Sequence, residues 1–178
     1  MTNTSNNKSK APNNLTILQR GEPVLAQVAQ TIHDVNSANI KQLIDDLTVT
    51  VAEAKGVGIA APQVGKSLRL FLMCSAPSER YPDAPLLPIT VVINPKIIKT
   101  SEQQVLGWEG CLSVKGKRAL VPRYSDIDVS YIDETGVLHN QHLTGFLARI
   151  FQHELDHLDG ITFDTKVSKL KWNMAKKK

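Results

Sequence analysis

One five-residue motif, H-E-x-x-H, constrains this chain of 178 residues more than any other feature. It reads His153-Glu-Leu-Asp-His157 and lies in a segment whose apolar residues recur at helical spacing: Phe146, Leu147, Ile150, Phe151, Leu155 and Leu158. Thr144 can cap this helix and Gly160 can end it. Residues four positions apart share one helix face, so His153 and His157 can present two imidazoles to one metal ion, with Glu154 beside the water that the ion activates.

A catalytic metal needs a third protein ligand, and the sequence after the motif does not supply one. The metzincin pattern requires a histidine where this chain has Phe163, and the glutamate of a thermolysin-like site is missing because no Glu follows Glu154. Asp159 lies too near the motif on the same helix, and Asp164 is expected in a turn. The upstream candidates are His33, Cys74, Cys111, His139 and His142.

Cys111 is the preferred third ligand because the segment Glu109-Gly-Cys-Leu-Ser113 places its thiol in a loop freed by glycine. Cys74 instead ends an apolar run and is expected to be buried, His33 to lie on the surface, and His139 and His142 to sit in a hairpin strand. A thiolate with two imidazoles suits Zn²⁺ or Fe²⁺ better than Mg²⁺ or Ca²⁺. The alternative, Cys111 as a nucleophile with a histidine base, leaves Glu154 without a role.

The composition, 42% hydrophobic and 21% charged, fits one globular domain. We expect a disordered polar leader over residues 1–14, a single catalytic domain over 15–168 and a basic tail over 169–178. The first 14 residues lack the apolar core of a signal peptide, and no apolar run reaches the roughly 20 residues of a membrane span, which predicts a cytoplasmic protein.

The net charge of +4 depends on lysines near the two ends of the chain. Between those lysines, 13 basic residues face 17 acidic ones, so the body of the protein is net −4. The basic tail is therefore either a solubilising end or a contact for a polyanion such as the ribosome.

The order of the predicted elements indicates an α+β fold. Apolar residues at helical spacing predict a helix over residues 37–54, with Ser37 as its cap and Gly56 as its stop. Strands are expected at 68–74, 90–94, 119–122, 127–132 and 137–143, the last two joined in a hairpin over residues 133–136, and a loop is expected at 75–88. We expect antiparallel sheets packed around the C-terminal helix that carries the motif.

The segment Gly56-Val-Gly-Ile-Ala-Ala-Pro-Gln63-Val-Gly65 is not a nucleotide-binding loop, because it follows a helix and lacks both phosphate-binding patterns. Two readings stay open. In one, its glycines serve only a turn; in the other, they let an extended peptide approach the backbone while Gln63 offers an amide donor to an oxyanion.

Together, G-x-G-x-A-A-x-Q, E-G-C-L-S and H-E-x-D-H resemble the three ordered motifs of the peptide deformylase family, over roughly residues 15–168. The resemblance implies an α+β metal-dependent hydrolase that removes the N-formyl group from the initiator methionine of nascent polypeptides and releases formate. It implies Fe²⁺ as the native metal, with Zn²⁺, Ni²⁺ or Co²⁺ as substitutes, held by Cys111, His153 and His157.

The same resemblance implies how hydrolysis proceeds: a hydroxide held by the metal attacks the formyl carbon, with Glu154 as general acid/base. Gln63 and the backbone N–H of Leu112 match the oxyanion donors, and Val57 and Gly58 match the wall that binds the peptide. The implied partners are N-formylmethionyl nascent peptides, with a ribosome contact through the tail, no membrane and no sequence-specific nucleic acid.

The chain departs from the best-known pattern of the family at Arg149, where an aliphatic residue is common, and at Ser113-Val-Lys-Gly116, where Ser-x-Pro is common. Two other functions stay open at this stage. One is a small metallopeptidase with the same ligands, and the other is a catalytically silent binding protein.

Overall fold

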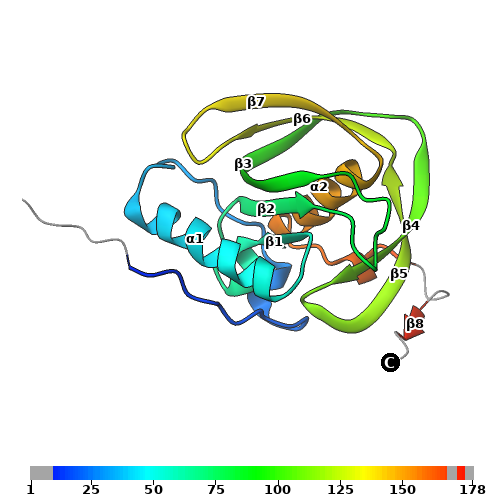
Figure 1. The fold of residues 1–178 in the computed structure, drawn as a ribbon, viewed down its shortest axis with the longest axis horizontal. Coiled ribbons are helices and arrows are strands. Elements are labelled where there is room, and N and C mark those ends of the chain that lie inside the picture. The colour runs from blue at the N-terminus through cyan, green and yellow to red at the C-terminus, as the bar shows by residue number, and fades with distance from the viewer. Residues whose placement is uncertain (1–9, 168–171, 175–178) are drawn as a thin grey trace, which may run out of the picture.

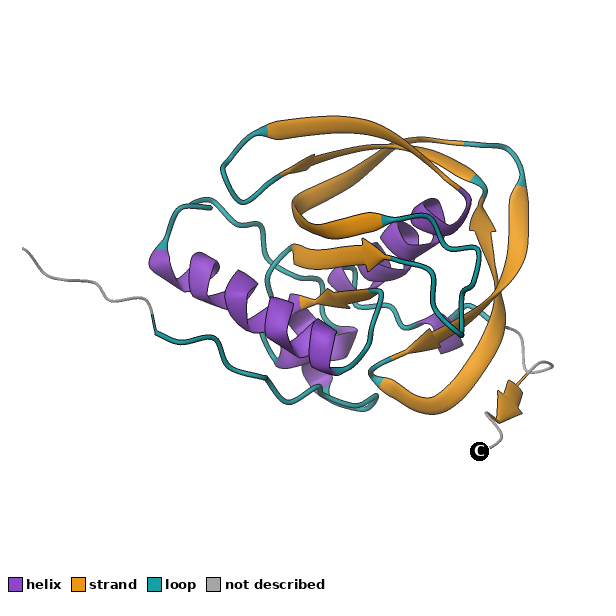
Figure 2. Cartoon of the chain, in the orientation of Figure 1, coloured by secondary structure: helices purple, strands orange, loops and turns teal. Residues whose placement is uncertain are grey.

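The computed structural model describes residues 10–167 and the backbone of residues 172–174. The predicted leader falls mostly on residues 1–9, and the predicted tail mostly on 168–171 and 175–178, so both predictions lie largely outside the described residues. The described part contains helices, short 3₁₀ turns and two separate β-sheets (Figures 1 and 2).

The larger sheet has five antiparallel strands in the order β1-β2-β3-β6-β7. Their bounds are β1 Gly58–Ala60, β2 Leu70–Ser75, β3 Leu87–Thr100, β6 Asp126–Ile132 and β7 Leu138–Thr144. The smaller sheet has the order β4-β5-β8, again antiparallel, with bounds β4 Gln104–Cys111, β5 Val114–Tyr124 and β8 Trp172–Met174. Because β1 ends the larger sheet, only one of its two edges is paired with another strand of that sheet.

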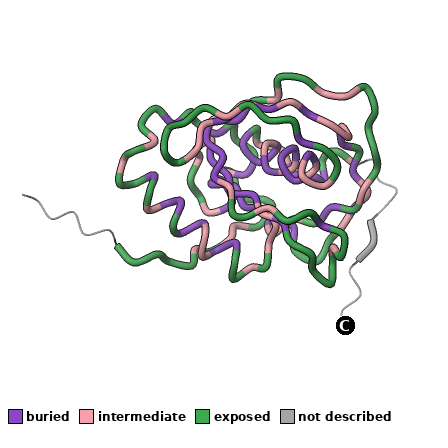
Figure 3. Tube along the Cα trace, turned by 45° about the horizontal axis from the view of Figure 1, so that its top comes forward, coloured by how far each residue is buried: buried purple, intermediate pink, exposed green. Residues whose placement is uncertain are grey.

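Helix α2 (Gly145–Leu158) lies inside the molecule, against β1 and β2 on one side and β5 on the other (Figures 1 and 3). Its Phe151 is fully buried and meets Phe71 of β2 edge-to-face, with ring centroids 5.2 Å apart. Helix α1 (Ala38–Glu53) packs its Leu47 into a second cluster of apolar side chains.

Strand β2 separates these two clusters of core residues. Phe71 and Met73 belong to the cluster around α2, whereas Leu70 and Leu72 belong to the cluster around α1. Side chains alternate between the faces of a strand, so a strand buried on both faces must be apolar at every position. This explains the unbroken apolar run that predicted the strand.

Both predicted helices and the α+β class with antiparallel sheets are confirmed, but details differ. Ser37 and Thr144 occupy the N-cap positions without a capping hydrogen bond from the side chain. The Ser37 hydroxyl instead donates to the carbonyl of Asp34, at 3.1 Å. Helix α1 ends at Glu53, and the left-handed residue after it is Lys55, with φ of 51°, rather than Gly56.

The strands differ more from prediction than the helices do. β3 and β5 are longer at both ends than the predicted 90–94 and 119–122, and β1, β4 and β8 were not predicted. β4 carries two glycines, and most of its residues are exposed or half-buried, so it lacks the alternation by which strands are recognised. Within residues 10–167, no helix combines the length and apolarity needed to cross a bilayer.

Candidate metal centre

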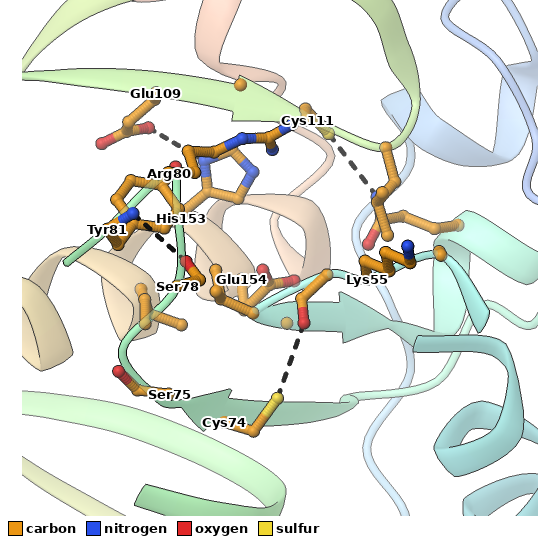
Figure 4. Close-up of a pocket in the computed structure, with 18 of the residues that line it drawn as sticks. Lys55, Cys74, Ser75, Ser78, Arg80, Tyr81, Glu109, Cys111, His153 and Glu154 are labelled. Carbon is orange, nitrogen blue, oxygen red and sulfur yellow. Dashed lines mark hydrogen bonds and ion pairs between the residues drawn. The ribbon is translucent and has the colours of Figure 1, made fainter. Parts of the chain in front are cut away.

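Helix α2 and the end of β4 bring Cys111, His153 and His157 together, and their ligand atoms all lie within 4.8 Å of one another. The Cys111 Sγ is 3.2 Å from His157 Nε2, and the two imidazole rings are 5.1 Å apart at an 80° angle. The register of the β4–β5 ladder shifts between Gly110 and Cys111, where the ladder approaches its turn. Figure 4 shows Cys111 and His153 facing the same pocket.

The three histidines among the other upstream candidates lie outside the lining of this pocket. His33 is exposed, and His139 and His142 on β7 each contact an aspartate, Asp133 and Asp128, at 2.7 Å. The prediction that Cys74 is buried was wrong. It is half-buried and lines the same pocket, where its thiol donates to the Gly56 carbonyl at 3.6 Å.

Glu109 is a site residue that the sequence analysis assigned no role. One of its carboxylate oxygens is 2.8 Å from His153 Nδ1. Arg123 donates to both carboxylate oxygens, at 2.8 and 2.9 Å, and Arg149 donates to one at 2.9 Å. Burial alone raises the pKa of Glu109, but hydrogen bonds and charges of Arg123 and His153 outweigh it and hold that pKa well below its usual range. A carboxylate can only accept, so His153 Nδ1 carries the proton and Nε2 is left to bind a metal.

A buried ion-pair chain continues from Glu109 to helix α2. Arg123 also donates to Asp156 at 2.6 Å, and Asp156 accepts from Lys166 at 2.6 Å. Asp156 is the aspartate of the H-E-x-D-H motif. The network therefore fixes the motif helix against β4 and β5. The one signal for it in the sequence was an acidic residue, Glu109, two positions before the candidate ligand Cys111.

The three candidate ligands fit a divalent transition metal. Burial and the charge of His153 lower the pKa of His157 well below its usual value, which keeps it in the neutral form that binds metals. Burial lowers the pKa of His153 as well, but hydrogen bonds to Cys111 and Glu109 outweigh this and raise it, so a metal must displace a proton there. His157 Nδ1 is buried without a partner in the described structure.

Glu154 points into the pocket beside these ligands (Figure 4). It is 4% exposed, and its Oε2 has no hydrogen-bond partner in the described structure. Burial raises the pKa of Glu154 to about 7. A Cβ atom on Gly58 would lie 2.7 Å from the Glu154 Cδ, so only glycine lets β1 approach this carboxyl.

Gln63 is 2% exposed and is held at both ends of its amide. Its oxygen accepts from the backbone N–H of Ala60 at 2.8 Å. Its nitrogen donates to the Ser113 hydroxyl at 3.0 Å and to the Cys111 Sγ at 3.5 Å. The amide donors are thus fixed next to the candidate metal ligands.

Val57, Gly58 and Leu112 line the same cleft, which has a volume of about 1470 Å³. Val57 and Gly58 belong to the β1 side of the cleft, and Leu112 lies in the turn between β4 and β5. Among the residues that the structure describes, one edge of β1 pairs with no other strand, and an extended peptide can add to the sheet there by backbone hydrogen bonds.

The family model described as polypeptide deformylase matches residues 14–173. A curated peptide deformylase 2 from Nostoc sp. is 55% identical over 156 residues, which covers 88% of this chain and 87% of that protein. Peptide deformylase 2 from Shewanella oneidensis is 50% identical over 148 residues, or 83% and 81% of the two chains.

Solved structures show the same similarity. The Met-Ala-Ser-bound crystal structure of a class I type b peptide deformylase from Acinetobacter baumannii matches with a TM-score of 0.85 and 40% identity, covering 89% of this chain and all of that one. A peptide deformylase from Synechococcus elongatus in complex with actinonin matches with a TM-score of 0.78 and 36% identity, covering 92% and 84%.

Proposed function

The chain belongs to the peptide deformylase family, and on that premise we propose that it removes the N-formyl group from the initiator methionine of nascent polypeptides and releases formate. One observation supports this most strongly. Cys111, His153 and His157 converge beside the cleft that holds Glu154, and the cleft is bordered by a sheet edge that pairs with no strand among the described residues. The three ligands and Glu154 can provide a metal site and a base, and the sheet edge provides a place for an extended peptide.

We propose Cys111, His153 and His157 as the metal ligands. A divalent ion bound there supplies Lewis-acid activation of water and of the formyl oxygen. The soft thiolate and two imidazoles favour Fe²⁺ or Zn²⁺. We propose Fe²⁺ as the native ion, with Zn²⁺, Ni²⁺ and Co²⁺ as substitutes. Glu109 holds the His153 ring in the tautomer that leaves Nε2 free.

Glu154 is our candidate for the general acid/base. Its buried carboxyl, with one oxygen unpartnered in the described structure, can take a proton from water and give it to the leaving amine of the methionine. Gln63 and the backbone N–H of Leu112 are the candidate donors to the oxyanion. For Gln63, this role requires one amide hydrogen to turn from its 3.5 Å contact with the Cys111 Sγ.

Val57 and Gly58 are proposed to bind the peptide backbone along the β1 edge. The substrate then lies with its formyl group at the metal ligands and its chain leading out of the cleft. We also propose a cytoplasmic location. We further propose a transient contact of the basic tail with the ribosome, which the lysines near the end of the sequence support because they attract a polyanion.

Products of a formyl-Met-Ala-Ser tripeptide distinguish this function from the two alternatives. Full-length protein purified without oxygen and loaded with Fe²⁺ is expected to release formate and intact Met-Ala-Ser. Cleavage between methionine and alanine would instead assign the site to a metallopeptidase. If a folded sample with verified metal content forms neither product, the remaining hypothesis is a catalytically silent binding protein.

A further inference from the structure

The outer part of the cleft is lined by cationic side chains that the proposed chemistry does not use. Four of them, here called the rim cations, are Lys55, Arg80, Lys115 and Arg118. Lys117 lines the cleft as well. The acidic side chains that line this outer part of the cleft are Glu53 and Glu79. The excess of positive charge stands out because the body of the protein is net −4.

The rim cations have no partners among the described residues. The ion pairs of the described chain use other cations, such as Arg20, Arg69 and Lys166. Lys55, Arg80 and Lys115 are exposed and Arg118 is half-buried, with its Cγ 3.5 Å from where a Cβ on Gly110 would lie. Their charges are therefore available to a ligand.

The rim cations come from three segments around the path of an extended peptide. Lys55 precedes Gly56 at the entrance to β1, Arg80 belongs to the loop between β2 and β3, and Lys115 and Arg118 lie on β5 just after Leu112. In the view of Figure 4, Arg80 and Lys55 lie to either side of Glu154. A peptide that added to the edge of β1 would leave the metal ligands along this side of the cleft.

We propose that the rim cations make this cleft selective for formylated peptides that carry Asp or Glu side chains after the methionine. The inference rests on the proposed function, because it identifies the substrates of the same site. Exposed apolar side chains of Leu86, Ile89 and Trp108 also line the cleft, which suits a peptide's side chains better than a phosphate backbone.

The size of the effect follows from the exposure of these charges. An exposed ion pair changes a binding constant by about 1.4–5-fold, so two contacts together give about 2–25-fold. The attraction is screened by salt, since the Debye length falls from about 30 Å at 0.01 M to about 3 Å at 1 M. Because the contacts lie away from the reacting bond, the effect belongs mainly in KM rather than in kcat.

The test compares three peptides, formyl-Met-Ala followed by Glu-Glu, Gln-Gln or Lys-Lys, all with amidated C-termini, on the metal-loaded full chain. At low salt, kcat/KM is expected to fall in the order Glu, Gln, Lys, and the three values are expected to converge near 1 M salt. The double variant Arg80→Gln/Lys115→Gln is expected to reduce the Glu-to-Gln ratio by about 2-fold or more. Lys41→Gln, an exposed position on α1 outside the cleft lining, is the matched control and keeps the ratio.

Equal kcat/KM for the Glu and Gln peptides at low salt would overturn the inference while leaving the proposed function intact. If a short oligouridylate then inhibits competitively, the rim cations are assigned to nucleic acid instead. Failure of the Gln peptide to release formate at all would instead count against the proposed function itself.

Discussion

At the scale of single residues, the close approach of Gly58 to Glu154 leaves no room for a side chain at position 58. We expect Gly58→Ala to displace the Glu154 carboxyl, because the new Cβ would lie 2.7 Å from Cδ. A misplacement of about 1 Å at a reacting group can cost about 10²-fold in rate, so formate release should fall by about that factor while metal content is retained.

Ile59→Val serves as the control for this substitution, since Ile59 is a neighbour in β1 that packs in the cluster around α1. It is expected to cost about 0.5–1.5 kcal/mol of stability and to leave turnover close to normal. The metal content and the rate of formate release are measured for both variants. Full activity in the Gly58→Ala protein would show that Glu154 tolerates the displacement or does not act as proposed.

Cys74 offers a second prediction at this scale, on pH. Burial and the nearby charge of Glu154 raise the pKa of Cys74 above its usual value of 9.0, because both disfavour the thiolate. Since only the thiolate is alkylated, modification by iodoacetamide should be slow at pH 8 and should accelerate as pH rises past 9. Peptide mapping by mass spectrometry gives the rate, and faster alkylation at pH 7 than of a free cysteine would contradict the assignment.

At the scale of elements, the junction of α2 with β4 and β5 depends on Arg123. This side chain is 3% exposed and pairs with both Glu109 and Asp156. Removing one member of a buried ion-pair network leaves uncompensated charge and costs about 3–5 kcal/mol. Arg123→Ala should therefore lower the free energy of unfolding in urea by about that amount, and should weaken metal binding because Glu109 orients His153.

The control for this junction is Lys99→Ala, at an exposed position on β3. A surface substitution of this kind usually changes stability by less than about 0.5 kcal/mol. An equal small loss in both variants would mean that the Arg123 network does not secure the motif helix.

The same junction shows what sequence patterns reveal and what they miss. The helical spacing around His153 and the apolar run before Cys74 are local patterns, and they predicted α2 and a strand at residues 68–74, which the structure has at Leu70–Ser75. β4 has no local pattern, since its residues are mostly exposed or half-buried and include two glycines. Its place depends on pairing with β5, from Gln104 opposite Tyr124 to Cys111 opposite Val114, which no single segment encodes.

Some residues of the candidate site could likewise be predicted from the sequence, and others could not. Cys111, His153 and His157 were selected by motif and chemistry, and the fold brings them together. The roles of Glu109 and Arg123 were missed because their partners lie 14 to 44 positions away in sequence. Cys74 was misjudged since an apolar run indicates a buried strand but not which positions at its end face a cleft.

At the scale of the whole molecule, metal binding is expected to add to the stability of the fold. The proposed ligands come from β4 and α2, so they are held in place only in the folded chain. An ion at 100 times its Kd stabilises the native state by about 2.7 kcal/mol, which corresponds to about 5–11 °C in Tm for a chain of this size.

Calorimetry with and without a chelator measures this shift. His157→Ala is expected to abolish it, whereas Glu154→Gln is expected to keep it, because the first removes a ligand and the second does not. A chelator-sensitive Tm in the His157→Ala protein would place the metal elsewhere in the molecule.

The measurement that tests the central claim most directly is formate release by the Glu154→Gln protein beside the unmodified protein, both loaded with Fe²⁺ and checked for metal content. The account predicts equal metal in the two proteins and a loss of about 10²–10⁴-fold in turnover of formyl-Met-Ala-Ser for the variant. Near-normal turnover in the variant at full metal content would contradict it.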